Sequence, residues 1–327
     1  MFSEIVTTQR GNPLTGGHEA VVVATRDRHG MPLRNVCWTD SGFIGVDPIP
    51  MADVETFYKK EYRQEYKGAV SPSGRHVLRA GRVALGRFTR IRDFFPEVAD
   101  KRLLTLDAGA SSGEFVYLMS RLGHKASGVE AHEGYAGHSK EVLGLDVKSG
   151  VFSEFKVEGK RFDLITMFHV LEHLEFPVQE VARLATALAD DGVFVIEVPN
   201  ILHRGMRFSH KWHRGHLSGF SARTLHATAL RAGLQAVVCG EIGEGGNLFG
   251  VFRKGPTISA EDVASRLAGN GPELSGLEAN SDADYFGRAS TWLKLAPKMF
   301  SQVEERCTAR RFKGAAAILD AVYSARV

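Results

Sequence analysis

The stretch Leu103-Leu104-Thr105-Leu106-Asp107-Ala108-Gly109-Ala110-Ser111-Ser112-Gly113-Glu114-Phe115 decides the fold of this 327-residue chain. Its apolar first half predicts a strand that ends at the carboxylate of Asp107. The small residues that follow predict a turn, with a helix opening near Gly113. A second predicted strand ends seventeen residues after Gly113, at Glu130. A strand, a glycine-bearing turn and a helix in this order admit a nucleotide-like ligand against the backbone.

The residue types in this turn suit a ligand that contains adenosine. A side chain at Gly109 or Gly113 would stand between the turn and a ligand packed on exposed amide groups. The carboxylate of Glu130 can accept two hydrogen bonds from a ribose diol, and Asp107 can hold the amino-acid end of a zwitterionic cofactor or orient the loop. The spacing is Asp-x-Gly-x-Ser-x-Gly, and the acid precedes the first glycine. This pattern favours S-adenosylmethionine over NAD.

We expect the cofactor to contact this turn, the end of the second strand and the end of the strand that begins at Asp163. The predicted cofactor-binding residues are Asp107, Gly109, Ala110, Ser111, Gly113, Phe115, Glu130, Ala131, Phe168 and His169.

Four ordered segments resemble motifs of class I S-adenosylmethionine-dependent methyltransferases. They are Asp107 to Gly113, Glu130, Phe162 to His173, and Asp191 to Asn200. Within that superfamily, the Phe-His-Val-Leu-Glu-His phrase that ends at His173, the Val-Pro-Asn phrase that ends at Asn200, and the segment from His213 to Ser221 resemble the branch of sugar C-methyltransferases and related small-metabolite enzymes. The resemblance implies a Rossmann-like sheet with ligands at the carboxyl ends of its first strands.

The alternation of strand and helix patterns predicts an α/β fold with a seven-stranded, mostly parallel sheet. The last two strands are separated by too few residues for a crossover helix, so they should form an antiparallel hairpin. The predicted strands are Leu103–Asp107, Ala126–Glu130, Asp146–Lys148, Asp163–Phe168, Val193–Val198, Gln235–Gly240 and Asn247–Arg253.

Four segments are expected along the chain. They are a small N-terminal β unit (1–50), a helical cap (51–98), the cofactor-binding methyltransferase core (99–255) and a helical C-terminal extension (256–327). The cap should contain helices over Ala52–Tyr66 and Arg75–Phe94. The extension should contain helices over Ala260–Leu267, Tyr285–Lys298 and Phe300–Tyr323, the last interrupted at Gly314, with a linker around Gly269–Asp284.

The chemistry of methyl transfer calls for a base when the acceptor is an alcohol or an acidic carbon, and histidine is the natural candidate. In the resembled sugar enzymes the loop after strand five carries Tyr-x-Glu-His, and its histidine acts as the base. Here the sequence is His213-Arg214-Gly215-His216, so His216 matches, whereas His213 replaces the tyrosine and Gly215 the carboxylate. This departure disfavours C-methylation. The predicted catalytic residues are His216, His213 and His173.

Three further residues are candidates for binding the substrate. In the resembled branch, tyrosines of the first cap helix fold over the mouth of the cofactor site, which makes Tyr66 a candidate. Arginines 75, 79, 82 and 90 share one face of the second cap helix, either as a solvated face or as a phosphate-binding stripe that includes Arg79. Asn200 ends the fifth core strand.

No metal is expected. The three cysteines are widely separated, and Asp40 stands where a zinc knuckle beginning at Cys37 would need its second thiolate. The spacing of His210, His213 and His216 suits neither a helical face nor a structural zinc site.

The composition indicates an ordinary globular chain, and a net charge of +3 gives no reason to expect nucleic acid. The first residues lack a signal-peptide pattern, and no apolar run approaches the ~18 residues of a membrane span. We therefore expect a cytoplasmic protein with a small-molecule substrate and no membrane partner. A homodimer through the N- or C-terminal extension stays open.

The leading hypothesis is an enzyme that transfers a methyl group from S-adenosylmethionine to a small polar metabolite, such as a sugar or a nucleotide-linked sugar, with O-methylation favoured over C- or N-methylation. Two alternatives stay open. One is a methyltransferase-like binding module without catalysis, which the missing carboxylate at Gly215 favours. The other is an RNA or protein methyltransferase, which the arginine face favours.

Overall fold

The computed structural model describes residues 2–58, 71–151, 154–157, 159–293 and 295–324. The chain divides into two compact units, each built from discontinuous stretches. The first contains Met1–Ala52, Phe168–Thr186 and Ile196–Trp292, and the second contains Asp53–Met167, Ala187–Val195 and Leu293–Val327. The predicted division into four consecutive segments stays a prediction.

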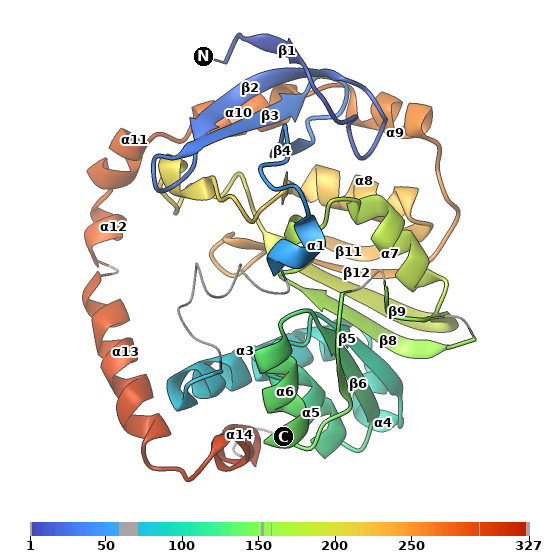
Figure 1. Cartoon of the computed structure of the whole chain (residues 1–327), viewed down its shortest axis with the longest axis vertical. Helices are drawn as coiled ribbons and strands as arrows, with labels where there is room; N and C mark the ends of the chain where they lie inside the picture. Colours follow the sequence, from blue (N-terminus) through green and yellow to red (C-terminus); the bar gives the residue numbers. More distant parts are fainter. Residues whose placement is uncertain (1, 59–70, 152–153, 158, 294, 325–327) are drawn as a thin grey trace. The chain divides into compact units, whose positions relative to one another are not determined.

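The predicted seven-stranded sheet is present, with the strand order β11-β12-β9-β8-β5-β6-β7 (Figure 1). Strand β5 pairs in parallel with both β6 and β8, and β6 pairs in parallel with β7. Strands β11 and β12 are antiparallel, which confirms the expected hairpin. The strands are β5 (Leu104–Ala108), β6 (Lys125–Glu130), β7 (Val147–Ser149), β8 (Phe162–Phe168), β9 (Leu188–Pro199), β11 (Leu234–Ile242) and β12 (Asn247–Lys254).

A second, five-stranded sheet contains the expected N-terminal β unit. Its order is β1 (Ile5–Thr7), β2 (Glu19–Arg26), β3 (Pro32–Trp38), β4 (Ile44–Val46) and β10 (Ser218–Gly219). Strand β10 was not expected, because it comes from the loop that carries His213 and His216. It pairs antiparallel with β4, and Gly45 permits the approach, since a Cβ there would lie 2.9 Å from the carbonyl oxygen of Leu217.

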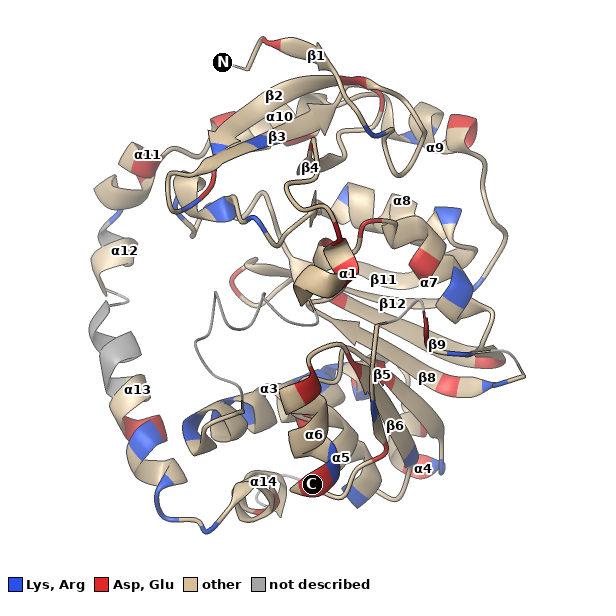
Figure 2. Ribbon diagram, in the orientation of Figure 1, with Lys and Arg blue, Asp and Glu red and all other residues tan. Residues whose placement is uncertain are grey.

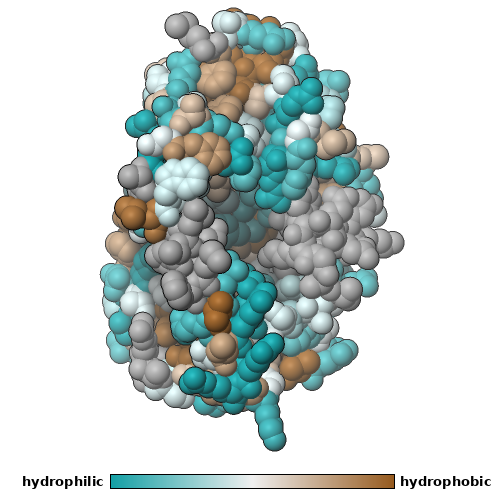
Figure 3. All heavy atoms as spheres, turned by 90° about the vertical axis from the view of Figure 1, so that its left-hand side faces the viewer, coloured by the Kyte–Doolittle hydropathy of each residue, from teal (hydrophilic) through white to brown (hydrophobic). Residues whose placement is uncertain are grey.

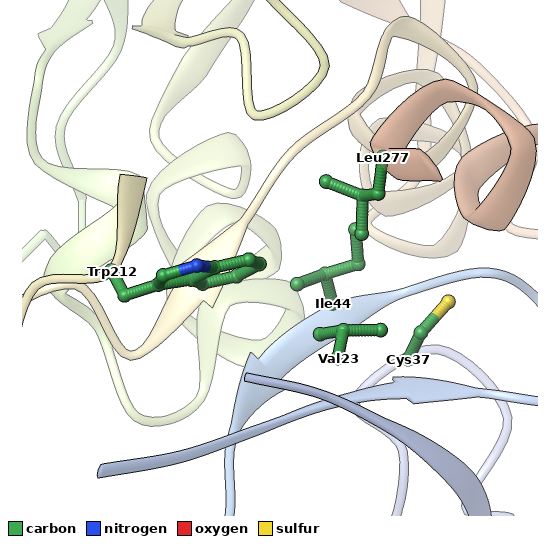
Figure 4. Close-up of a cluster of buried hydrophobic side chains, with 5 residues drawn as sticks. All are labelled: Val23, Cys37, Ile44, Trp212 and Leu277. Carbon is green, nitrogen blue, oxygen red and sulfur yellow. The ribbon is translucent and has the colours of Figure 1, made fainter. Parts of the chain in front are cut away.

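An apolar cluster ties that loop to the small sheet (Figure 4). Val23, Cys37 and Ile44 of the sheet meet Trp212 of the loop and Leu277 of a later helix, and all five are buried. Burial of this surface stabilises the unit, and it fixes the chain on both sides of Trp212. The histidine loop and the N-terminal sheet therefore share an apolar core within the first unit.

The helices largely follow the apolar patterns of the sequence. The second predicted cap helix is α3, in which Val77, Ala84, Leu85, Phe88 and Ile91 are buried as the pattern requires. The α-helices are α1 (Val54–Thr56), α3 (Gly74–Phe94), α4 (Glu97–Asp100), α5 (Glu114–Arg121), α6 (Glu133–Glu141), α7 (Pro177–Ala185), α8 (Ala222–Arg231), α9 (Ala260–Leu267), α10 (Gly271–Glu278), α11 (Asp282–Gly287), α12 (Ala289–Leu293), α13 (Leu295–Ala309) and α14 (Ala315–Ser324). The described residues also include the short 3₁₀ helices η3 (Leu171–His173) and η4 (Phe208–Lys211).

The expected linker around Gly269–Asp284 is wrong. This stretch forms α10 and the start of α11. Pro272 is favourable in the first turn of a helix, and Leu277 is buried. Its polar composition was misleading, since Glu273 is also buried and accepts a hydrogen bond from Ser221 Oγ at 2.8 Å. The predicted continuous helix Tyr285–Lys298 is likewise wrong, because α11 ends at Gly287 and α12 begins at Ala289.

The end of the C-terminal extension packs on the second unit. A Cβ on Gly81 of α3 would lie 2.7 Å from Leu319 Cδ2, so the glycine makes room for α14. The hydroxyl of Tyr323 donates a hydrogen bond to the carbonyl oxygen of Glu114 at 2.8 Å, and Tyr117 Oη donates to Asp320 Oδ1 at 2.9 Å. Helix α14 is thus part of the packing around α3 and α5.

Within the described residues, no helix has both the length and the apolar character that crossing a membrane requires. Figure 3 views the side of the molecule that carries α11 to α13, and it shows small hydrophobic patches among mainly hydrophilic atoms. Phe286 and Trp292 are among the exposed large hydrophobic residues.

Candidate functional site

The turn after β5 has the backbone geometry that its small residues allow. Gly109, Ser111 and Gly113 all have positive φ angles, of 92°, 49° and 89°. The amides of Gly109 and Ala110 both donate to the carbonyl oxygen of Val129, at 2.8 and 2.9 Å. The turn is therefore tied to the end of β6, where the second acid stands.

Both oxygens of the Glu130 carboxylate accept backbone hydrogen bonds. Oε2 accepts from the amide of Ser111 at 2.9 Å and Oε1 from the amide of His132 at 3.0 Å, and the residue is buried. A carboxylate oxygen has two lone pairs and can accept more than one hydrogen bond. Glu130 joins the loops after β5 and β6, which gives it a role in the shape of the turn besides the predicted one.

Asp107 is buried at the end of β5, and its Oδ1 accepts a hydrogen bond from Thr166 Oγ1 of β8 at 2.7 Å. Burial raises the pKa of Asp107 to about 6, although this hydrogen bond and the charge of Arg87 oppose the rise. Arg87 was missed by the sequence reasoning. It lies beside the arginine face on which Arg79 was chosen, so helical angle gave no reason to include it.

Gly113 has a packing role besides the predicted contact with the cofactor. A Cβ there would lie 2.7 Å from Leu145 Cδ1 and 2.9 Å from Ser139 Oγ, so the missing side chain makes room for packing against α6. The predicted cofactor contacts Ala110 and Phe115 have buried side chains, and Ala131 is partly buried. The side chain of Ala110 belongs to an apolar cluster with Val116 and Ala136.

His169 directly follows the buried Phe168 at the end of β8 and has a left-handed backbone, with φ of 55°. Its Nε2 lies 3.2 Å from Glu197 Oε1, and its Nδ1 lies 3.5 Å from Glu172 Oε1. Burial lowers the pKa of His169, but the two carboxylates outweigh this and raise it to about 9. Asn247 Nδ2 donates to the same oxygen of Glu197 at 2.9 Å. Sequence reasoning missed Glu197 and Asn247, because they lie on β9 and β12.

The three predicted catalytic histidines lie together in the first unit. The ring of His216 stacks on that of His213 at a centroid distance of 4.6 Å, and it meets the ring of His173 edge-on at 4.9 Å. Gly215 holds two of the rings through its backbone. Its carbonyl oxygen lies 2.6 Å from His173 Nδ1, and its amide donates to His213 Nδ1 at 2.8 Å.

Burial and neighbouring positive charges keep two of these imidazoles neutral. They lower the pKa of His213 to about 3 and hold the pKa of His216 well below its usual value. Both rings are therefore uncharged at neutral pH, and each is a weak base.

A cavity of about 130 Å³ lies beside these histidines in the first unit. Three residues of its lining each have a buried polar atom that makes no hydrogen bond to any residue the structure describes, namely Glu172 Oε2, Trp212 Nε1 and Ser218 Oγ. His213 and His216 also line it. Buried polar groups are normally paired, so three unpaired ones around one space indicate a polar occupant.

The predicted substrate residues are dispersed. Asn200 lines this cavity, but its side-chain amide is used in hydrogen bonds to Glu241 Oε1 at 2.9 Å and to the Gly245 carbonyl at 3.0 Å. Arg79 is exposed on α3, where Figure 2 shows several basic residues. Arg82 on the same face pairs with Glu304 at 3.0 Å. Tyr66 lies outside the described residues.

The parallel sheet with its terminal hairpin, and the acid-bound glycine turn after β5, have the arrangement of the class I methyltransferase fold. Residues 82–238 match the family described as a methyltransferase domain. The match supports an S-adenosylmethionine-dependent methyltransferase, with S-adenosylmethionine as the cofactor of this chain. The enzyme class and the cofactor predicted from the sequence are thereby confirmed.

Several solved structures resemble this chain. The CcbJ methyltransferase from Streptomyces caelestis is 15% identical, with 62% of this chain and 99% of that chain covered and a TM-score of 0.44. The magnesium protoporphyrin IX methyltransferase from Synechocystis PCC 6803, with bound SAH, is 14% identical, with 62% and 98% covered and a TM-score of 0.46. A search among curated proteins gives no match.

Proposed function

We propose that the protein methylates a hydroxyl group of a small polar metabolite, such as a sugar or a nucleotide-linked sugar. The observation that carries this proposal is the cavity beside His213 and His216, with its three unpaired polar groups. The resemblance of the sequence to the small-metabolite branch supports the same acceptor class.

The chemistry of the cavity wall favours hydroxyl groups. The Glu172 carboxylate requires a donor, the Trp212 indole N–H requires an acceptor, and Ser218 Oγ can serve either role. A hydroxyl group supplies both a donor and an acceptor, so a compound with several hydroxyls satisfies all three atoms. Ile44 and Ile201 add apolar surface, which suits the carbon face of such a compound.

The cofactor residues follow from the turn after β5. We propose that Glu130 binds the ribose, that Asp107 orients the loop or holds the amino-acid end, and that the backbone from Gly109 to Gly113 lies against the ligand. Ala110, Phe115, Ala131, Phe168 and His169 complete the proposed contacts. When bound, S-adenosylmethionine supplies a methyl group made electrophilic by its sulfonium.

The protein has to orient the hydroxyl and take its proton. In the transfer, the oxygen–carbon bond forms as the carbon–sulfur bond breaks, the sulfur keeps the electron pair, and the hydroxyl proton passes to a neutral imidazole. We propose His216 for this role, with His213 and His173 holding its ring through the contacts described above. Because its pKa is low, His216 suits a hydroxyl group better than a weakly acidic carbon.

The main alternative is a binding module without catalysis, for which the replacement of a carboxylate by Gly215 is the argument. The backbone of Gly215 holds His173 and His213 at hydrogen-bonding distance, which is the orienting role that the carboxylate would have. This observation favours the enzyme. Methylation of RNA or protein has less support, since Arg82 of the arginine face is engaged by Glu304.

A transfer assay with labelled S-adenosylmethionine tests the proposal across free sugars, nucleotide-linked sugars, phenols and transfer RNA. We expect label in a sugar or nucleotide-linked sugar, bound through oxygen. Label only in transfer RNA or protein would overturn the acceptor class. The absence of transfer to any acceptor, with cofactor binding intact, would favour the module.

A further inference from the structure

The geometry points to a binding site for one divalent transition-metal ion, such as Zn²⁺, formed by Glu172, His173 and His216. One possible ligand atom from each of these residues lies within 4.8 Å of the other two. The inference goes beyond the proposed function, in which metal-free His216 takes the proton: a neutral imidazole has one lone pair, so His216 is not the base while it binds an ion. The inference also departs from the expectation drawn from the sequence.

The ring of His173 is oriented as a metal ligand requires. Its Nδ1 lies 2.6 Å from the carbonyl oxygen of Gly215, so Nδ1 carries the proton and donates it. The lone pair of the neutral ring is then on Nε2, which faces Glu172 Oε1 at 3.8 Å. A backbone carbonyl that fixes the tautomer in this way is the usual support of a metal-bound histidine.

Glu172 supplies the second, independent observation. It is only 2% exposed, and its Oε2 accepts no hydrogen bond from the described part of the chain. Its Oε1 faces His169 Nδ1 at 3.5 Å, so His169 compensates one side of the carboxyl group and leaves the other open. A buried carboxylate oxygen without a partner is costly, and a bound cation would remove that cost.

The distances are close to those around a single ion. Zinc binds histidine nitrogen and carboxylate oxygen at about 2.0–2.2 Å, which places neighbouring ligand atoms ~3–4 Å apart. The separation of 3.8 Å between His173 Nε2 and Glu172 Oε1 fits, and the limit of 4.8 Å for the set requires only small rotations of the side chains.

The donor set selects the kind of ion. Two imidazoles and one carboxylate suit Zn²⁺ and its first-row neighbours, whereas Mg²⁺ and Ca²⁺ prefer oxygen. Three protein ligands leave at least one position open to a further ligand. His213 is not part of the set, because its Nδ1 accepts the amide proton of Gly215. Glu172 and His216 both line the cavity, so an open position would be reached from that space.

The competing explanation is a proton in place of the metal, with a charged His173 beside Glu172. Titration of the chelator-stripped full-length protein with Co²⁺ separates the two, because cobalt bound by nitrogen and oxygen ligands gives visible absorption bands. Calorimetry with Zn²⁺ gives the stoichiometry, and Mg²⁺ serves as the oxygen-preferring control. We expect one Zn²⁺ per chain, cobalt bands in the same complex, and no heat with Mg²⁺.

Two variants locate the site. Glu172→Gln and His173→Ala should each weaken Zn²⁺ binding about tenfold or more, the loss typical when a metal site is damaged. His210→Ala is the matched control, since His210 lines the same cavity but lies outside the cluster, and it should bind normally. Binding of S-adenosylhomocysteine reports whether each variant is folded.

The titration of the wild-type protein tests for the metal site even if a variant fails to fold. Absence of cobalt bands and of Zn²⁺ heat in the wild-type protein would overturn the metal site and leave methyl transfer untouched. Unchanged Zn²⁺ affinity in folded Glu172→Gln or His173→Ala protein would also overturn it. Absence of methyl transfer by the metal-free wild-type protein would instead count against the proposed function.

Discussion

The turn after β5 and the cavity beside the histidines differ in whether their buried polar atoms have hydrogen-bond partners in the protein. In the turn, both oxygens of Glu130 and one of Asp107 accept hydrogen bonds within the protein. Around the cavity, Glu172 Oε2, Trp212 Nε1 and Ser218 Oγ accept or donate none within the described residues. The first region is thus organised before a ligand binds, whereas the second leaves polar groups for a ligand to satisfy.

If the histidines beside the cavity take part in methyl transfer, His216→Ala should cause the largest loss of activity. Loss of a general base typically costs 10²–10⁴ in rate, so turnover should fall by about 100-fold or more. Affinity for S-adenosylhomocysteine should stay within about twofold, because His216 is not among the proposed cofactor contacts. Steady-state kinetics and calorimetry measure the two.

His226→Ala is a suitable control, because His226 lies on α8 outside the histidine cluster. An unchanged rate in His216→Ala would show that His216 is not the base. A large loss of cofactor affinity in the same variant would remove the contrast between the two regions.

The complementary change is Glu130→Ala in the organised turn. It removes two hydrogen bonds to a charged carboxylate, each worth about 1.5–3 kcal/mol, as well as the proposed ribose contact. Affinity for S-adenosylhomocysteine should fall about 10- to 100-fold, as measured by calorimetry. Glu133→Ala, at an exposed position in the first turn of α6, should leave the affinity unchanged. Equal affinity in both variants would contradict the role of Glu130.

The packing of the turn can be tested through its glycine. Gly113→Ala places a Cβ against Leu145 and Ser139 on a backbone with positive φ, so the free energy of unfolding should fall by about 1–3 kcal/mol. Gly86→Ala is the matched control, since a Cβ there meets nothing within 4 Å and alanine favours the α3 helix. Urea unfolding compares them. A neutral Gly113→Ala would show that the turn adapts easily.

The last prediction concerns the pH dependence of stability through Asp107. Its pKa is about 6 in the folded protein and about 3.9 in an unfolded chain, so the folded state favours the protonated form. The unfolded state loses its proton first, and stability should therefore decline as the pH rises from about 4 through 6. A shift of roughly two pKa units corresponds to ~2–3 kcal/mol.

Asp107→Asn should lack this decline. Urea unfolding measures the free energy of unfolding of both proteins at pH 4.5 and pH 8. Any excess stability of the wild-type protein over Asp107→Asn should be smaller at pH 8 than at pH 4.5, or change sign. A parallel pH response in the two proteins would mean that Asp107 does not titrate in this range.

Local sequence predicted the core well because its signals are local. The apolar runs, the carboxylates at the strand ends and the small residues of the turn predicted β5, β6, β8 and the hairpin. The prediction failed where polar residues are buried by distant contacts. The composition of the α10 region predicted a linker. In the structure, Glu273 accepts a hydrogen bond from Ser221, and Leu277 packs against residues of the N-terminal sheet.

The candidate site shows the same division. His173 and His216 were chosen for their positions after strands four and five. The sequence did not indicate that Glu172 lies near both residues, because the histidine spacing considered for a metal site, His210, His213 and His216, lies within one loop. The partners Glu197 and Asn247 of His169 come from two further strands. No local pattern links them.

The sequence by itself determined the class of fold, the cofactor turn and the order of its acids, since each depends on residues that are neighbours in the chain. Only the tertiary structure decided that the histidine loop pairs with the N-terminal sheet, that Gly215 orients two imidazoles through its backbone, and that Glu172 keeps an unpaired oxygen beside the cavity. These features arise from burial and from contacts between distant segments, and the free energy of such contacts depends on which surfaces meet when the chain folds.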